Sequence, residues 1–143
     1  MTGNPVAPDR IRDMFDTISG VYDPMNTLIS GFQEPRWRRR AVQAAALKPG
    51  MRALDVATGT GKVALDLWRA VQPGGGVEGV DFAEGMLAVG RKRYADRPGL
   101  TFTTGDALAL PVPDGSFDAA TIAFGMRNLP DYGKGFAEMA RSV

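Results

Sequence analysis

Beyond residue 50, short apolar runs alternate with segments whose apolar residues recur at helical spacing. The runs, which have the length of buried strands, lie at 52–57, 77–82, 100–104 and 117–124. The segments with helical spacing lie at 63–71, 86–94 and 136–143. Strands that alternate with helices form a parallel sheet with helices on both faces. The order of elements therefore predicts an α/β, Rossmann-like fold.

The first third of the chain has a different pattern. Apolar residues at helical spacing predict helices at 11–18 and 35–47, separated by a break at Tyr22, Asp23 and Pro24. A chain of 143 residues is long enough for one domain with a substantial core. We therefore expect residues 1–50 to form a helical lid over a ligand-binding core, residues 51–143, within one structural domain.

The last predicted helix coincides with the end of the chain at Val143. In a parallel sheet such a helix crosses over to a further strand, so we expect a core that is truncated after its fourth strand and the following helix. The fourth strand would then lie at an exposed edge of the sheet. The alternative is a complete four-stranded protein that covers this edge by forming a homodimer.

Composition excludes several kinds of site and partner. The chain has no cysteine and no histidine, which removes disulfides, thiolate nucleophiles and the common zinc sites, so we expect no metal. A catalytic proton transfer would have to use a carboxylate, a tyrosine, a lysine or water. The formal net charge of +1 does not favour nucleic acid as a partner. With neither a secretory signal nor the roughly 20 apolar residues of a membrane span, the chain is expected to be cytoplasmic.

A glycine turn joins the first predicted strand to the helix that follows it. The turn contains Gly59, Thr60 and Gly61, where glycine lets the backbone approach a ligand and the helix N-terminus presents unpaired N–H groups. This pattern leaves the ligand open, because Gly59, Gly61 and Ala64 also satisfy the G-x-G-x-x-A form of the dinucleotide fingerprint. A tight turn that binds nothing is the remaining alternative.

Asp81 ends the second predicted strand, 20 residues after Gly61. A carboxylate in this place can accept hydrogen bonds from both hydroxyls of an adenosine ribose, which favours a nucleoside cofactor. Both NAD and S-adenosylmethionine contain that ribose. The alternative for Asp81 is an acid that only caps the next helix.

Two further acids distinguish between these cofactors. Asp55 lies inside the strand before the glycine turn, where it could hold a cofactor amine or ammonium but would repel a pyrophosphate. Asp106 lies at the end of the third predicted strand, placed to accept a hydrogen bond from the exocyclic amine of adenine. Together they favour S-adenosylmethionine. The alternative for the segment around Asp106 is a proline-containing surface turn.

Six segments carry a resemblance to a known family. They read FDTISGVYDPMN at 15–26, RWRRR at 36–40, LDVATGTG at 54–61, GVDFAEGML at 79–87, GDALALPVPDGSFD at 105–118 and TIAFGMRNLPD at 121–131. In this combination the chain resembles the UbiE/MenG/COQ5 family of ubiquinone/menaquinone-biosynthesis C-methyltransferases. Many methyltransferases share the cofactor motifs, whereas Tyr-Asp-x-Met-Asn and Phe-Gly-x-Arg-Asn are more specific to this family.

The resemblance implies a class I methyltransferase fold that binds S-adenosylmethionine. The family's cofactor positions fall on Thr60, Asp81, Asp106, Ala107 and Ala123. The family usually has a serine where this chain has Ala123, so a side-chain hydrogen bond is lacking there. Lys62 and Gly85 also depart from the pattern, because the family commonly has an acid at the first position and a small polar cap at the second.

The resemblance also implies the chemistry. The family's substrates are a reduced demethylmenaquinone or a methoxy-polyprenyl-benzoquinol, whose ring carbon becomes more reactive when a ring hydroxyl loses its proton. We expect Arg127 to stabilise the resulting anion and Asn128 to orient the arginine or the substrate. Tyr22 or Asp23, acting directly or through a water, is the expected base. The alternatives are a surface turn at 127–128 and a packed aromatic at Tyr22.

Six arginines within the first 40 residues are interleaved with Phe15, Phe32 and Trp37. They could contact anionic lipid where a prenylated quinol resides, which would make the protein peripheral at the membrane. The alternative is a solvated charged face. Two functional alternatives also stay open: another small-molecule methyltransferase with the same cofactor, and a non-catalytic nucleotide- or NAD-binding fragment.

Overall fold

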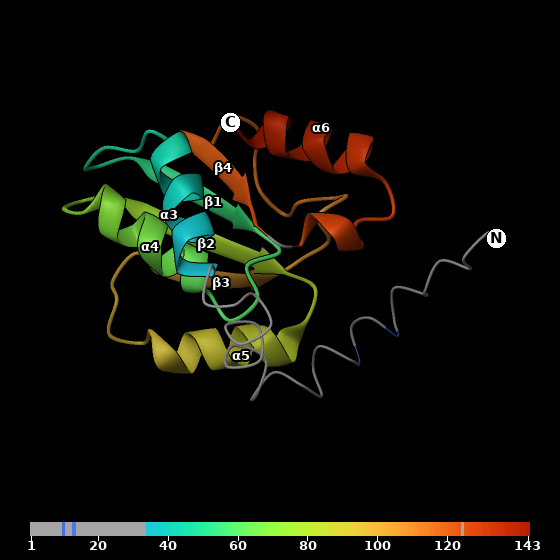
Figure 1. Ribbon diagram of the computed structural model, residues 1–143, viewed down its shortest axis with the longest axis horizontal. Coiled ribbons are helices and arrows are strands. Elements are labelled where there is room, and N and C mark those ends of the chain that lie inside the picture. The colour runs from blue at the N-terminus through green and yellow to red at the C-terminus, as the bar shows by residue number, and fades with distance from the viewer. Residues whose placement is uncertain (1–9, 11–12, 14–33, 124) are drawn as a thin grey trace.

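The computed structural model describes residues 10, 13, 34–123 and 125–143, and Figure 1 shows its ribbon diagram. At the centre of this part lies one sheet with the strand order β3-β2-β1-β4, in which every neighbouring pair is parallel. The strands are β1 (Arg52–Val56), β2 (Gly76–Asp81), β3 (Leu100–Thr104) and β4 (Ala119–Ile122). The prediction of a parallel sheet is confirmed. β4 lies at one edge of the described sheet, as expected, and is shorter than the predicted run at 117–124.

Helices separate β1 from β2 and β2 from β3 along the described chain, whereas a loop without a helix joins β3 to β4 (Figure 1). They are α3 (Glu34–Ala44), α4 (Lys62–Val71), α5 (Glu84–Arg93), the 3-10 helix η1 (Met126–Asn128) and α6 (Tyr132–Ser142). α4 packs on β1 and β2, and α3 packs on α4. α5 packs on β2 and β3, whereas α6 packs on β4 at the other edge of the sheet.

Each face of the sheet has its own apolar cluster, because successive residues of a strand point to opposite faces. Ala53 of β1 belongs to a buried cluster with Leu67 of α4. Its neighbour Leu54 belongs to a second cluster, which includes Phe117 and is packed against by Met139 of α6. Helices therefore cover both faces, as the sequence predicts.

Two local features differ from expectation. α3 ends at Ala44 rather than near residue 47, and the chain then turns through Ala46, whose φ of 50° is left-handed and cannot continue a helix. η1 was not predicted, because a single 3-10 turn is too short to show a period. The expected boundary near residue 50 between lid and core stays a prediction, since most of the first 33 residues lie outside the described part.

The strand order reverses beside β1. After β2 and β3 have been added on one side of β1, β4 pairs with its other side. Asp55 of β1 consequently lies in register with Gly79 of β2 and with Thr121 of β4. In open α/β sheets, ligands bind outside the carboxyl ends of the strands at such a reversal.

Candidate functional site

A pocket lies at the carboxyl ends of β1, β2 and β4, where the strand order reverses. It contains about 900 Å³ of empty space, open solvent included. The predicted site residues that line it are Asp55, Gly59, Thr60, Asp81, Ala107, Ala123 and Asn128. The fold therefore brings residues from distant parts of the sequence to one cavity.

Asp81 ties two turns of the pocket together. Its side chain accepts a hydrogen bond from the backbone N–H of Gly59 (2.8 Å) and another from that of Ala83 (2.9 Å). The first contact holds the glycine turn after β1, and the second holds the turn that begins α5. The residue is only 8% exposed, yet it lines the pocket. Asp81 thus holds the turn before α5 without capping that helix, and it also lines the pocket.

Asp55 lies at the end of the neighbouring strand and has different partners. Its carboxylate accepts hydrogen bonds from the hydroxyls of Thr58 and Thr121, both at 2.7 Å. Burial raises the pKa of Asp55 to about 6, since the loss of solvation outweighs these hydrogen bonds, and the negative charge of Asp81 raises it further. The side chain lines the pocket, but its nearest partners are hydroxyls of the protein itself.

Three glycines at the site have different structural roles. Gly59, with a left-handed φ of 58°, lines the pocket. Gly61 has a φ of 87° and faces the other way: a Cβ on it would lie 2.6 Å from the ring of Phe102, so a glycine lets the start of α4 approach β3. Gly125, which lines the pocket, leaves room for Ala57, because its Cβ would lie 2.3 Å from the Cβ of that residue.

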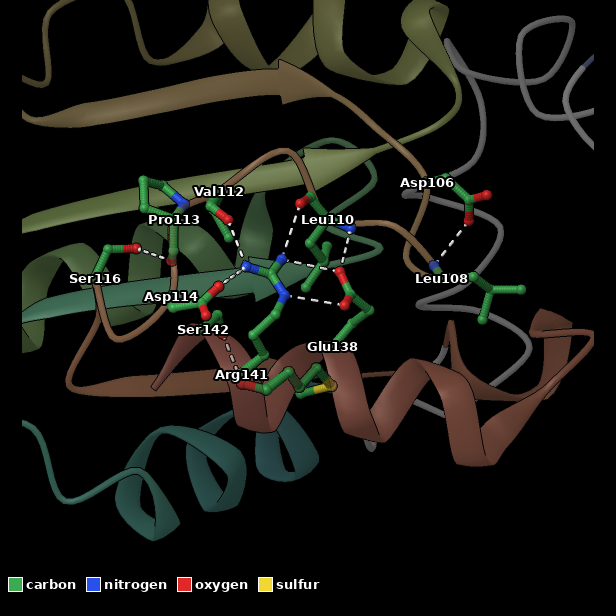
Figure 2. A network of polar contacts seen from close by, with 11 residues as sticks. Asp106, Leu108, Leu110, Val112, Pro113, Asp114, Ser116, Glu138, Arg141 and Ser142 are labelled. Atoms are coloured by element: carbon green, nitrogen blue, oxygen red, sulfur yellow. Dashed lines mark hydrogen bonds and ion pairs between the residues drawn. The ribbon is translucent and has the colours of Figure 1, made fainter.

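The third predicted acid, Asp106, lies beside the pocket rather than in its described wall. Gly105 and Ala107, on either side of it, line the cavity, whereas Asp106 is exposed. Its carboxylate accepts a hydrogen bond from the backbone N–H of Leu108 (2.8 Å), a contact that shapes the loop after β3 (Figure 2). The surface-turn geometry that the sequence left as an alternative is therefore present here.

Arg141 of α6 holds that loop in place (Figure 2). Its guanidinium donates to the carbonyls of Val112 (2.8 Å) and Leu110 (3.0 Å) and to the carboxylates of Asp114 (2.7 Å) and Glu138 (2.9 Å). Glu138 in turn accepts from the backbone N–H of Leu110 (2.8 Å). Contact with these two acids raises the pKa of Arg141 above its ordinary value. The sequence analysis missed this network, whose only local signal is the Glu138–Arg141 spacing of three residues on one helix.

The structure describes only two of the four predicted catalytic residues. Asn128 of η1 lines the pocket, while Arg127 is exposed and outside the described wall. Ala123 lines the cavity and also packs against the apolar cluster under α4. Tyr22 and Asp23 lie outside the described residues.

Charged side chains form a part of the wall that the sequence analysis did not predict. Glu34 and Arg38 of α3 and Lys62 at the start of α4 line the pocket. Lys62 had been noted only as a departure from the family pattern, and nothing local in the sequence pairs it with a residue of α3. Among the residues that the structure describes, no cluster of acids could hold a metal ion, and no helix is both long and apolar enough to cross a membrane.

The chain is similar to proteins of known family along almost its whole length. Residues 4–143 match the model of the ubiE/COQ5 methyltransferase family. The chain is 47% identical over 136 residues to the ubiquinone/menaquinone biosynthesis C-methyltransferase UbiE of Geobacter sulfurreducens, covering 93% of this chain and 53% of that protein. It is 42% identical over 132 residues to the demethylmenaquinone methyltransferase of Staphylococcus saprophyticus, covering 92% and 57%. The chain thus spans somewhat more than half the length of these curated relatives.

Solved structures show the same fold. A SAM-dependent methyltransferase from Aquifex aeolicus superimposes with a TM-score of 0.68 at 25% identity, over 74% of this chain and 57% of that one. The [4+2]-cyclase SpnF superimposes with a TM-score of 0.78 at 22% identity, over 99% and 58%, a likeness that concerns the fold alone. The parallel sheet, the pocket at its strand reversal and the family match agree: this chain belongs to the ubiE/COQ5 methyltransferase family.

Proposed function

We propose that the chain is the cofactor-binding part of an S-adenosylmethionine-dependent C-methyltransferase of quinone biosynthesis. Its substrate would be a demethylmenaquinol or a related polyprenyl-benzoquinol, methylated at a ring carbon. The observation that supports S-adenosylmethionine as the cofactor is the buried carboxylate of Asp81, which two backbone amides hold at the pocket wall. The proposed substrate is inferred from the family and from the names of the two curated relatives.

The residues present fit S-adenosylmethionine. A carboxylate offers about four acceptor positions, so Asp81 can accept ribose hydroxyls in addition to the two amides that it already binds. Gly59 and Gly105 leave backbone exposed to the cavity. Asp55 lines the pocket beside the glycine turn, where its negative charge would repel the pyrophosphate of NAD.

Bound S-adenosylmethionine supplies a methyl group on a positively charged sulfur. The chain's own residues would hold the two reactants in line and keep water out, which is where most of the rate enhancement of such a displacement arises. Asp81 would fix the ribose, and Gly105 and Ala107 would border the adenine. Asn128 would contact the substrate at the pocket, with Arg127 next to it stabilising the negative charge on the quinol oxygen. Tyr22 or Asp23 as the base stays a prediction.

Calorimetry on the chain with S-adenosylhomocysteine and with NADH tests the cofactor. We expect S-adenosylhomocysteine to bind and NADH not to bind. Binding of NADH alone would instead support the dinucleotide-binding alternative.

Methyl transfer tests the reaction. The chain should transfer the labelled methyl group of S-adenosylmethionine to the ring of a soluble, short-tailed demethylmenaquinol. Because the relatives are longer, a parallel assay should use a chain extended at its C-terminus to their length. Transfer by the extended chain alone would restrict the role of these residues to cofactor binding, while transfer to other acceptors but never to a quinol would favour another small-molecule methyltransferase.

The prenylated substrate also motivates a proposed peripheral membrane contact. α3 exposes Arg36, Arg39 and Arg40, with Trp37 43% exposed beside them. An interfacial aromatic among cations is typical of a surface that binds anionic lipid. Co-sedimentation with anionic but not neutral vesicles is the expected result. The homodimer stays a prediction, to be checked by light scattering.

A further inference from the structure

Three charged side chains of alternating sign meet where α3 crosses the start of α4. Glu34 lies between two cations: its carboxylate is 3.5 Å from Nη1 of Arg38 and 3.6 Å from Nζ of Lys62. Glu34 is only 7% exposed, and the side chains of Arg38 and Lys62 are 18% and 23% exposed. All three line the cavity that contains Asp55 and Asp81. Charged side chains that are buried or partly buried on a pocket wall lose solvation, a cost that a charged ligand could offset.

The contacts within the triad are long. The distances from Glu34 to Arg38 and to Lys62 are near the outer limit for an ion pair, well beyond the 2.7–2.9 Å or so of a strong charge-assisted hydrogen bond. Nε of Arg38 is buried and makes no hydrogen bond, although a carboxylate oxygen of Asp66 lies 3.4 Å away. Arg38, which lines the pocket, therefore has a buried N–H donor without a hydrogen bond, which is a costly state for a polar group.

Asp55 is less suited to bind the amino-acid end of the cofactor than the sequence suggests. Its carboxylate accepts hydroxyl hydrogen bonds from Thr58 and Thr121. It also offers a single sign of charge, whereas the amino-acid end of S-adenosylmethionine carries both an ammonium and a carboxylate. The triad offers both signs side by side.

We propose that the triad of Glu34, Arg38 and Lys62 binds the zwitterionic amino-acid end of the cofactor. Arg38 and Lys62 contact its carboxylate, and Glu34 contacts its ammonium. This inference rests on the proposed function, and it assigns residues of α3 a direct part in cofactor binding. The adenosine end then lies at Asp81, so the cofactor spans the pocket from the end of β2 to the crossing of α3 and α4.

Ligands that differ only at the amino-acid end test the proposal on the unmodified chain. S-adenosylhomocysteine carries both charges, decarboxylated S-adenosylhomocysteine lacks the carboxylate, and 5′-methylthioadenosine lacks the whole amino-acid end. We expect calorimetry to show that loss of the carboxylate weakens binding roughly tenfold or more, as for a lost charge-assisted contact. Equal affinity for the first two ligands would overturn the proposal. If none of the three binds, the proposed function itself fails.

Variants then assign the contact to particular residues. Arg38→Met, which retains an apolar stem, should weaken binding of S-adenosylhomocysteine roughly tenfold or more and leave binding of 5′-methylthioadenosine unchanged. Arg38→Lys should restore part of the loss because it keeps the charge. Arg69→Met is the matched control, since Arg69 also contacts Asp66, at 3.1 Å, but is 63% exposed and outside the described pocket wall.

The role of the triad could instead be only to dock α3 on α4. Arg38→Met would then weaken both ligands by the same factor, or weaken neither, and either result contradicts the proposal. If Arg38→Met fails to fold, the comparison of ligands on the unmodified chain still decides. Lys62→Met should act in the same direction as Arg38→Met, again without affecting 5′-methylthioadenosine.

Discussion

Asp55 and Asp81 are the same residue type at the carboxyl ends of two adjacent parallel strands, and both are buried, but their partners differ. Asp81 binds backbone amides of two turns, at Gly59 and Ala83. Asp55 binds hydroxyl side chains, of Thr58 and Thr121. Asp81 thus joins the glycine turn to the start of α5, whereas Asp55 joins β1 to Thr58 of the glycine turn and to Thr121 of β4. A residue pattern predicts an acid at a strand end but not which of these roles it takes.

The largest effect should come from removing the acid with backbone partners. Asp81→Ala leaves two buried amides without an acceptor and removes the ribose contact, so binding of S-adenosylhomocysteine should fall by roughly a hundredfold or more. Asp118→Ala is the matched control, because Asp118 also accepts a backbone hydrogen bond, from the N–H of Arg52 (2.8 Å), but lies before β4 rather than after a strand of the site. Calorimetry on both variants checks this, and unchanged affinity in Asp81→Ala would refute its role.

The loop after β3 also borders the pocket, and it is held by Arg141 of α6, which is far from it in the sequence. Arg141→Met removes the donors to Leu110 and Val112, so the loop that carries Gly105 and Ala107 should loosen. We expect a lower melting temperature and weaker binding of S-adenosylhomocysteine, by a smaller factor than in Asp81→Ala. Asp114→Asn, which removes the negative charge of one exposed partner of Arg141, should change the affinity little. An Arg141→Met variant with full affinity would show that the loop does not need this anchor.

The close contact between Ala57 and Gly125, just beyond the ends of β1 and β4, can be tested with a larger side chain. In Gly125→Ala the new Cβ would lie 2.3 Å from the Cβ of Ala57, so the backbone has to shift. Overpacking of this kind costs about 2 kcal/mol of unfolding free energy. Gly133→Ala is the control, since its Cβ would meet nothing closer than 3.4 Å and it lies in α6. Urea unfolding measures both, and equal stability would mean that the contact relaxes freely.

The smallest effect is the pH dependence that Asp55 confers. The pKa of Asp55 is about 6 in the folded chain and near its ordinary value of 3.8 in the unfolded chain, so the folded state binds more protons between these values. Stability should therefore fall as pH rises through that window. Relative to Asp55→Asn, the unmodified chain should lose about 1 kcal/mol between pH 5 and pH 7.5. Parallel urea titrations at the two pH values give this difference, and identical pH profiles would contradict the raised pKa.

The elements of the core could be predicted from the sequence because strands and helices have patterns of apolar residues that are visible within a few residues. Periods of two and of about 3.6 depend only on local geometry, and parallel strands end at a common edge. For these reasons the positions of the strands and the placing of Asp55 and Asp81 at one edge followed from the pattern alone. The short η1 had no period to detect.

The parts of the site that could not be predicted depend on contacts between residues far apart in the sequence. Asp106 and Ala107 are neighbours, yet only Ala107 faces the cavity, because contacts across the loop set its path. Glu34 meets Lys62 only because α3 crosses the start of α4.

The amino-acid sequence by itself determined the α/β order, the glycine turn and the acids at the strand ends, since each is encoded within a single element. Only the tertiary structure decided which side chains share the pocket and which partners each acid has. The physical reason is that packing selects one arrangement of the elements, and the solvation and charge around a side chain depend on that arrangement.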